Sequence, residues 1–277
     1  MMKQNILIAD SGSTKTDWVL DGKCVHTQGI NPFHQDEETI RGILRDELCP
    51  NLKSQISNIQ SIRFYGSGVR PELEEKMQRL LAEAFPHATD IEAHGDLLGA
   101  CIALCGNHEG IACILGTGAN SCLYDGQHIV MNTPPLGYIL GDEGSGAVLG
   151  IRFLNALYKN RLPENMKTVF EAHTAMQMPQ VIERVYRQPM PNRWLASLST
   201  FIHEYISEPA VEQLVVDNFR QFIVKNIAPY HRPDLPINAV GSIAFYYKDQ
   251  LGAAVKAEGY TLGKVVRSPL DALVEME

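Results

Sequence analysis

The chain has 277 residues, of which 45% are hydrophobic and 20% are charged, and its formal net charge is −8. This composition is typical of a globular protein with enough chain for one large domain or two smaller ones. The negative charge argues against nucleic acid as a partner, and no apolar run of about 18 residues suggests a membrane span. The N-terminus lacks the pattern of a secretory signal, so we expect a cytoplasmic protein.

The cysteines do not follow a disulfide or zinc pattern. None of them forms a C-x-x-C pair in this long chain. Two of them lie four residues apart on one predicted helix and could help to hold a metal, but buried free thiols are the preferred interpretation. The six are Cys24, Cys49, Cys101, Cys105, Cys113 and Cys122.

The first part of the chain predicts alternating strands and helices. Pro71 opens one of the helices at a first-turn position, where its missing N–H is not needed. Asp21-Gly22 predicts a turn with positive φ after the second strand. Strands are expected at 5–9, 17–20 and 62–66 and within 88–96, and helices at 36–48, 71–85 and 97–106.

The same pattern restarts near residue 107, which predicts a domain boundary there. The segment 136–150 is dense in glycine, and a helix is expected to begin near Ser145. Strands are expected at 111–115, 120–124 and 128–132, helical periodicity at 163–230, a strand, glycine turn and continuing helix at 236–258, and a last strand and helix at 260–266 and 269–276.

Two stretches repeat one design: IADSGSTKTDWVLDG from Ile8 and ILGTGANSCLYDG from Ile114. A turn of small residues between two strands can aim several backbone N–H groups at one anion. Plain hairpin turns are the alternative, and the repetition favours phosphate binding by two turns that hold one polyphosphate. Neither stretch is a Walker A loop or a Rossmann fingerprint. The candidate residues are Gly12, Ser13, Thr14 and Lys15 in the first turn and Gly116, Thr117, Gly118 and Asn120 in the second.

Only the first stretch carries an aspartate at the bend, Asp10. Phosphates would repel a bare carboxylate, but with Mg²⁺ between them the carboxylate becomes a ligand, often through water. One such carboxylate suffices, so the second stretch can lack it. A third element, AVGSIA at 239–244, closes a strand with a glycine and opens a helix, a pattern that can flank a nucleotide.

Four motifs occur in a fixed order: DSGSTKTD, HGD, LGTGANS with LGDEGSG, and AVGSIA. This order resembles the sugar kinase, Hsp70 and actin ATPase superfamily. Within it, the chain resembles the N-acetylglucosamine kinase-like branch, which shares a family with the ATPases that activate benzoyl-CoA reductase and 2-hydroxyglutaryl-CoA dehydratase. The resemblance implies an α/β fold with two RNase H-like domains around an ATP-binding cleft. The expected domains are 1–106 with a returning C-terminal helix at 268–277, and 107–267.

The resemblance also implies roles for the nucleotide-side residues. Asp10 is expected to order magnesium waters, and Thr14 and Lys15 to face the phosphates. Thr117 and Gly118 are expected to form the second phosphate grip. The adenosine motif corresponds to Gly241 and Ser242. ATP and Mg²⁺ are therefore the expected cofactors.

On the sugar side, a hydroxyl that attacks the γ-phosphate needs a base. Asp96 matches the catalytic aspartate of the branch, and a helix N-cap is its alternative role. Asn31 resembles the branch's sugar-binding asparagine, with a turn residue before Pro32 as the alternative. Gly66 and Gly68 are expected to line the cleft.

Asp142 and Glu143 resemble the acidic pair that binds sugar hydroxyls, and carboxylates in the first turn of the following helix are the alternative. One departure concerns the segment before them. The branch commonly has Gly-Gly-Trp-Gly there, whereas this chain has Pro-Pro-Leu-Gly at 134–137. The change removes an aromatic residue that would contact the sugar.

The expected function is ATP-dependent phosphorylation of an amino sugar, with N-acetylglucosamine and its 6-phosphate as the first choice. The resemblance suggests a homodimer. One alternative is an ATPase that drives electron transfer through an iron–sulfur cluster shared between subunits. Another is a sugar or nucleotide sensor without catalysis, although such a binder has no use for the base Asp96.

Overall fold

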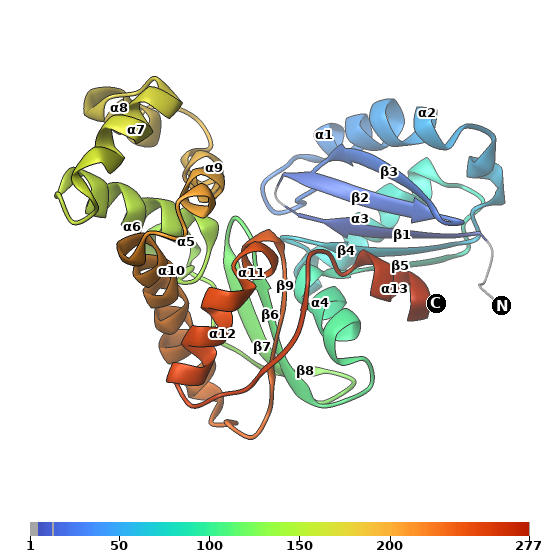
Figure 1. Ribbon diagram of the computed structural model, residues 1–277. Helices are drawn as coiled ribbons and strands as arrows, with labels where there is room; N and C mark the ends of the chain where they lie inside the picture. Colours follow the sequence, from blue (N-terminus) through green and yellow to red (C-terminus); the bar gives the residue numbers. More distant parts are fainter. Residues whose placement is uncertain (1–4, 13, 277) are drawn as a thin grey trace. The chain divides into compact units, whose positions relative to one another are not determined.

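The computed structural model describes residues 5–12 and 14–276. The chain divides into two compact units (Figure 1). Unit 1 comprises the residues up to Asn107 together with the segment that begins at Ser268, and unit 2 comprises His108–Arg267. The N-terminal unit therefore includes the end of the chain.

Unit 1 is built on one five-stranded mixed sheet with the strand order β3-β2-β1-β4-β5. β1 pairs antiparallel with β2 and parallel with β4, and β4 pairs parallel with β5. The strands are β1 (Ile6–Ser11), β2 (Lys15–Leu20), β3 (Lys23–Gln28), β4 (Ser61–Gly66) and β5 (Asp90–Gly95). The helices are α1 (Glu37–Gly42), the π-helical η1 (Ile43–Leu48), α2 (Cys49–Leu52), the 3-10 helix η2 (Lys53–Asn58), α3 (Pro71–Ala84), α4 (Asp96–Cys105) and α13 (Leu270–Met276).

Both faces of this sheet are covered by helices. Successive side chains of a strand point to opposite faces, and the central strands carry apolar residues on each face. Leu7 and Trp18 pack with α1, η1 and α3 in one core. On the other face, Ile8 packs with residues of α4 and with Leu270 and Leu273 of α13. The last helix of the chain thus completes the core of unit 1.

Unit 2 repeats this connectivity. Its sheet has the order β10-β9-β6-β7-β8, in which β6 is antiparallel to β7 and parallel to β9. β6 and β7 therefore correspond to β1 and β2. The strands are β6 (Gly110–Leu115), β7 (Ala119–Tyr124), β8 (Ile129–Asn132), β9 (Ile237–Val240) and β10 (Leu262–Val266). This repetition confirms the predicted α/β class with two domains of one topology.

The helices of unit 2 form a large core that includes many residues of α6, α9, α10 and α12. α6 and α9 approach so closely that a Cβ at Gly150 would lie 2.2 Å from the backbone oxygen of Leu195. The helices are α5 (Gly137–Leu140), α6 (Gly146–Tyr158), α7 (Glu164–Thr174), α8 (Met178–Tyr186), α9 (Pro191–Glu204), α10 (Pro209–Phe222), the π-helical η3 (Ile223–Ile227), the 3-10 helix η4 (Ala228–Tyr230), α11 (Ser242–Tyr246) and α12 (Lys248–Ala257).

Three segments of the chain differ from the prediction. The single helix expected at 36–48 is instead α1 followed by a π-helical segment, η1, and then α2. The helix expected to continue through 246–258 breaks at Tyr247, whose ψ of 31° ends α11 before α12 begins. The glycine-dense segment contains an unpredicted short helix, α5.

In the described part of the chain, the helices are too short or too polar to cross a membrane.

Candidate active site

The parallel strands of unit 1 end together, and several motif residues lie at that edge of the sheet. Ser11, Gly66 and Gly95 stand in register at the ends of β1, β4 and β5. The backbone N–H of Ser67 donates to the Ser11 carbonyl at 2.8 Å. Asp10 and Asp96 are therefore held at one edge, where open α/β sheets bind ligands.

Asp96 is the first residue of α4, and Gly95 takes the cap position. The alternative interpretation of Asp96 as the N-cap is therefore wrong. Burial raises the pKa of Asp96 to about 6, opposed by hydrogen bonds from the backbone N–H groups of Leu97 and Asp96 itself. A carboxylate with this pKa is largely ionised at neutral pH and can accept a proton.

Asp10 is part of a row of polar residues that crosses the sheet of unit 1. The register places His26, Asp17, Asp10, Tyr65 and His94 side by side on β3, β2, β1, β4 and β5. Burial raises the pKa of Asp10 to about 7, and the carboxylates of Asp96 and Asp17 add to the rise. Burial and the neighbouring carboxylates therefore both disfavour the ionised form of Asp10.

The first turn brings Gly12, Thr14 and Lys15 together, and Ser13 lies outside the described residues. The N–H of Gly12 donates to the Lys15 carbonyl at 3.0 Å, which closes the turn between β1 and β2. Lys15 is the first residue of β2, and its ammonium lies 2.7 Å from the Asp17 carboxylate. The motif itself did not indicate that Asp17 would be the partner of Lys15.

Asn31 and Gly68 lie against each other in unit 1. The Asn31 side-chain oxygen accepts from the N–H groups of Phe33 and His34, so the predicted turn role is present. A Cβ at Gly68, where φ is +77°, would lie 2.1 Å from that oxygen. Gly66 is required by packing as well, because a Cβ there would lie 2.3 Å from the Phe64 ring.

The second turn, at residues 116–118, is attached to the start of α6. The N–H groups of Gly146 and Ala147 donate to the carbonyls of Gly116 and Thr117 at 2.9 and 3.2 Å. Ser145 caps the same helix by accepting from the Val148 N–H. These bonds explain why the GTGANS and GDEGSG motifs occur together, since the second motif holds the first in place.

The space above this turn differs between its two glycines. A Cβ added to Gly116 would meet nothing within 4 Å, whereas one added to Gly118 would lie 3.0 Å from Asp142 Oδ2. Asn120 is turned into β7, where its side-chain oxygen accepts from Asn132 at 2.9 Å. The backbone at Gly116 is therefore open to a ligand, and Asp142 lies beside the turn.

Asp142 and Glu143 precede α6 and its cap, so the alternative placement in the first helical turn is wrong. Burial raises the pKa of Asp142 to about 6. Burial also acts to raise the pKa of Glu143, but the pKa is lowered overall, chiefly by a hydrogen bond from Lys225 at 2.7 Å. Lys225 belongs to the π-helical η3 and was not identified from the sequence.

Gly241 connects β9 to α11, as the sequence predicted. Its φ is +120°, and a Cβ would lie 2.3 Å from the Leu115 carbonyl oxygen, so only glycine fits. Ser242 follows as the exposed first residue of α11. The end of β9 is thus pressed against the end of β6, next to the second turn.

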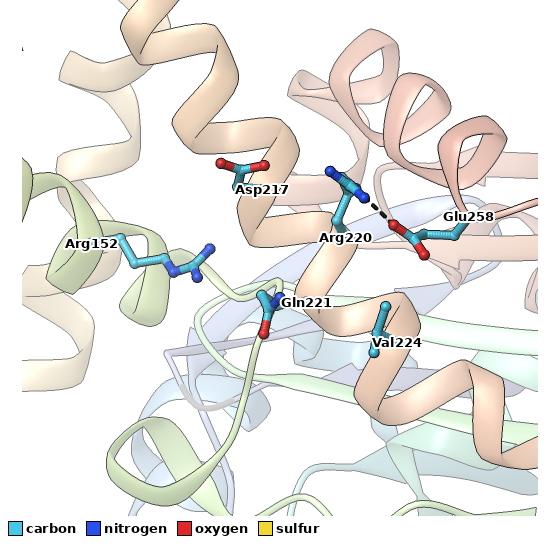
Figure 2. A pocket seen from close by; sticks show the side chains of 6 residues that line it. All are labelled: Arg152, Asp217, Arg220, Gln221, Val224 and Glu258. Carbon is cyan, nitrogen blue, oxygen red and sulfur yellow. Dashed lines mark hydrogen bonds and ion pairs between the residues drawn. The ribbon is translucent and has the colours of Figure 1, made fainter.

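A pocket of ≈ 360 Å³ lies elsewhere in unit 2, and none of its lining residues is a predicted site residue (Figure 2). Arg220 there pairs with Glu258 at 2.7 Å. The lining residues are Arg152, Asp217, Arg220, Gln221, Val224 and Glu258. This pocket is separate from the motifs that define the candidate site.

The residues present fit a magnesium ion. Within residues 5–12 and 14–276, no three His, Cys, Asp or Glu side chains are grouped as a metal centre. Magnesium bound with a nucleotide needs only one or two carboxylates, because phosphates and water supply the other ligands. The carboxylates of Asp96 and Asp17 add to the raised pKa of Asp10, and a bound cation would oppose that effect.

The comparisons with known proteins bear on this site. The chain is 48% identical to the "Putative N-acetylglucosamine Kinase" from Porphyromonas gingivalis, with a TM-score of 0.95, and the match covers 98% of this chain and 97% of that one. The chain belongs to this N-acetylglucosamine kinase-like family. The similarity to the Porphyromonas protein thus extends to the sequence as well as the fold.

Two more distant structures show the fold alone. A kinase of the same description from Chromobacterium violaceum is 15% identical, with a TM-score of 0.72 over 98% of each chain. A ROK family glucokinase from Streptomyces griseus, solved with glucose and AMPPNP, is 15% identical, with a TM-score of 0.54 over 97% of each chain. No protein-family model and no curated protein matches the chain.

These comparisons confirm the sugar kinase part of the predicted resemblance and the actin-like ATPase fold. They do not support the branch of ATPases that activate reductases and dehydratases. None of the six cysteines, all of which lie in the described part of the chain, forms a disulfide.

Proposed function

We propose that this protein is an ATP-dependent kinase of an amino sugar, with N-acetylglucosamine as acceptor and its 6-phosphate as product. The observation that carries the proposal is the 48% identity along nearly the whole chain to the Porphyromonas protein. The position of Asp96 at the carboxyl end of β5 supports it, because a kinase of this type needs a base and a sensor does not.

In the proposed reaction, the Asp96 carboxylate accepts the proton of the sugar 6-hydroxyl. The hydroxyl oxygen then bonds to the γ-phosphorus of ATP, the bond between that phosphorus and the bridging oxygen breaks, and ADP leaves. Phosphoryl transfer depends mainly on positioning and charge neutralisation. A half-buried carboxylate with a pKa of about 6 suits the base, since it is ionised at neutral pH yet can hold a proton.

On the nucleotide side, we assign the phosphates to the turns around Gly12 and Gly116. Gly116 supports this assignment because its surroundings leave the backbone accessible. Asp10 would hold Mg²⁺ through water, and that ion supplies charge neutralisation at the phosphates. Gly241 and Ser242 are assigned to the adenosine.

On the sugar side, we assign Asn31 and Asp142 to hydroxyl groups. The Asn31 oxygen is used within its own turn, which leaves the amide N–H₂ as the group that it offers. The Glu143 carboxylate already binds the Lys225 ammonium. To contact a sugar hydroxyl, it must either bind the hydroxyl and Lys225 together or release Lys225. A homodimer and a cytoplasmic location remain predictions.

The test is a coupled assay of ATP consumption over N-acetyl sugars, amino sugars and plain hexoses. We expect the highest kcat/KM with N-acetylglucosamine. Asp96→Asn should lower turnover by roughly 10²- to 10⁴-fold while nucleotide still binds. Asp90→Asn is the matched control, since Asp90 begins β5, the strand that ends just before Asp96, and forms an ion pair with Arg63.

Equal turnover by the wild-type protein and Asp96→Asn would remove Asp96 from the mechanism. A protein that binds N-acetylglucosamine and ATP without consuming ATP would favour the sensor instead.

A further inference from the structure

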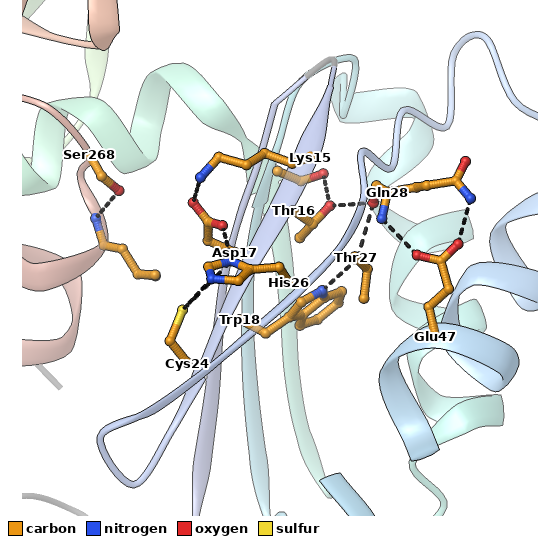
Figure 3. A network of polar contacts seen from close by, with 12 residues as sticks. Lys15, Thr16, Asp17, Trp18, Cys24, His26, Thr27, Gln28, Glu47 and Ser268 are labelled. Carbon is orange, nitrogen blue, oxygen red and sulfur yellow. Dashed lines mark hydrogen bonds and ion pairs between the residues drawn. The ribbon is translucent and has the colours of Figure 1, made fainter. Parts of the chain in front are cut away.

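A network of three side chains, an ammonium, a carboxylate and an imidazole, lies beside the first turn of unit 1 (Figure 3). The Lys15 ammonium contacts one oxygen of Asp17 at 2.7 Å, and Nδ1 of His26 contacts the other at 2.6 Å. Asp17 and His26 stand opposite each other in the β2–β3 register. The Asp17 carboxylate is therefore held from both sides.

The three side chains differ strongly in exposure. The Asp17 side chain is 12% exposed, whereas those of Lys15 and His26 are 63% and 65% exposed. Asp17 is thus the fixed member of the group, and Lys15 reaches back to it from the solvent. Exposed ion pairs contribute little to the stability of a protein, so a gain in stability does not explain this arrangement well.

The position of the network relates it to the candidate site. Asp17 is also the register partner of Asp10 on β1. Side chains directly opposite in an antiparallel pair lie on the same face of the sheet. Asp10, Asp17 and Lys15 consequently share one face, because side chains two residues apart on a strand point the same way.

We propose that Asp17 and His26 are positioning residues that orient Lys15 toward the nucleotide phosphates. This inference rests on the proposed function, in which Lys15 faces the phosphates. A lysine ammonium is a point charge on a flexible chain, and holding it in place beforehand removes part of the ordering cost of binding. His26 acts one step further away, by fixing the Asp17 carboxylate.

The direction of one effect distinguishes this role from simple electrostatics. Removing a negative charge near bound phosphates should strengthen the binding of an anionic nucleotide. If Asp17 positions Lys15, its removal should instead weaken binding. The readout is the Kd of Mg-AMPPNP measured by calorimetry, which needs no sugar and no turnover.

We expect Asp17→Asn to weaken the binding of Mg-AMPPNP by roughly three- to tenfold. In a Lys15→Met background, the same change should leave the affinity unchanged or strengthen it, since the residue that it positions is gone. Tighter binding by the single variant Asp17→Asn, or equal weakening in both backgrounds, would overturn the inference.

His26 provides a graded test. His26→Ala should weaken binding in the same direction, and His26→Asn should restore it, because an asparagine amide can donate from nearly the same place as Nδ1. Asp21→Asn is the matched control: Asp21 lies in the turn at the other end of the same hairpin, where its carboxylate accepts from the Asn5 N–H, and its change should leave the affinity unaltered.

Failure of the inference and failure of the proposed function give different results. Wild-type protein that does not bind Mg-AMPPNP would overturn both. Wild-type protein that binds it and phosphorylates the sugar, with Asp17→Asn binding equally well, would overturn only the role of Asp17.

Discussion

At the scale of single residues, the dominant feature of unit 1 is an accumulation of carboxylates on one face of its sheet. Burial is the largest cause of the raised pKa of both Asp10 and Asp96, and Asp96 and Asp17 act further on Asp10. Proteins arrange such groups where chemistry or a cation requires them. The raised pKa values mean that the ionised forms of both carboxylates are disfavoured in the protein alone, and the proposed Mg²⁺ would favour the ionised form of Asp10.

The pH dependence of the reaction should report the base. Asp96 must be deprotonated to accept a proton, and burial raises its pKa to about 6. We expect kcat/KM for the sugar to rise from pH 5 to 7 and to level off above that. Asp142 also has a pKa of about 6, so the same profile should be measured for Asp142→Asn. A profile that falls across this range would contradict a carboxylate base.

Replacing Asp10 should separate stability from function. The pKa of Asp10 is raised in the folded protein, so its ionised form is disfavoured there and stability falls as pH rises through about 4 to 7. Asp10→Asn removes this penalty and should stabilise the ligand-free protein at pH 8 by about 1 kcal/mol or more. Magnesium-dependent turnover should fall sharply. Urea denaturation of both proteins at pH 8 and pH 4 checks this prediction. The stability gain of Asp10→Asn over the wild-type protein should be smaller at pH 4.

At the scale of elements, both turns close on themselves, and the second is also attached to a helix. The second turn is fixed by α6, whose first N–H groups bind the carbonyls of Gly116 and Thr117. Within the turns, the Gly12 N–H donates to the Lys15 carbonyl in the first, and the Gly116 N–H donates to the Gly118 carbonyl in the second. The N–H groups of Gly12 and Gly116 are therefore used to fix the shape of the turns, and an anion would be bound by other groups of each turn.

Two glycine-to-alanine changes in unit 2 should have opposite signatures. Gly241→Ala meets the Leu115 carbonyl and a φ of +120°, so it should destabilise the protein by about 1–3 kcal/mol or more. The Cβ of Gly116→Ala would meet nothing within 4 Å, so this change should alter stability by less than about 0.5 kcal/mol. It should weaken the binding of Mg-AMPPNP if a phosphate approaches the backbone there. The melting temperature measures the stability of each variant, and the Kd of Mg-AMPPNP measures its nucleotide affinity. Normal nucleotide affinity in Gly116→Ala would argue against phosphate at this turn.

At the scale of the whole molecule, the chain folds as two units of one topology, and its last segment belongs to the first unit. Leu270 and Leu273 of α13 are buried with Ile8 of β1. Residues distant in sequence thus share a core, and unit 1 cannot complete that core before the end of the chain is present.

A substitution in α13 should therefore weaken unit 1 in particular. Leu273 is 2% exposed, and Leu273→Ala should cost about 2–5 kcal/mol through lost burial and the cavity left behind. Hydrogen exchange should accelerate in β1 and β2 more than in β6 and β7. Uniform acceleration in both sheets would show that the units unfold together. Asp271→Asn, at an exposed position of the same helix, is the control.

The sequence by itself determined the α/β class, most strands and helices, the four motifs and the family, because these depend on local periodicity, turn chemistry and residue order. The apolar runs of the sequence form β1, β4 and β6. The glycine turn predicted at Gly241 is present, in a conformation that only glycine fits. The assigned roles of the site residues remain predictions.

Only the tertiary structure decided which side chains meet. The pairing of Asp17 with Lys15 and His26 depends on the register of three strands, and the Lys225–Glu143 ion pair joins residues 82 positions apart. The π-helical segments and the break at Tyr247 were likewise invisible, since packing around them outweighs helical periodicity. Local patterns encode elements, whereas contacts between distant residues are selected by the free energy of the whole fold.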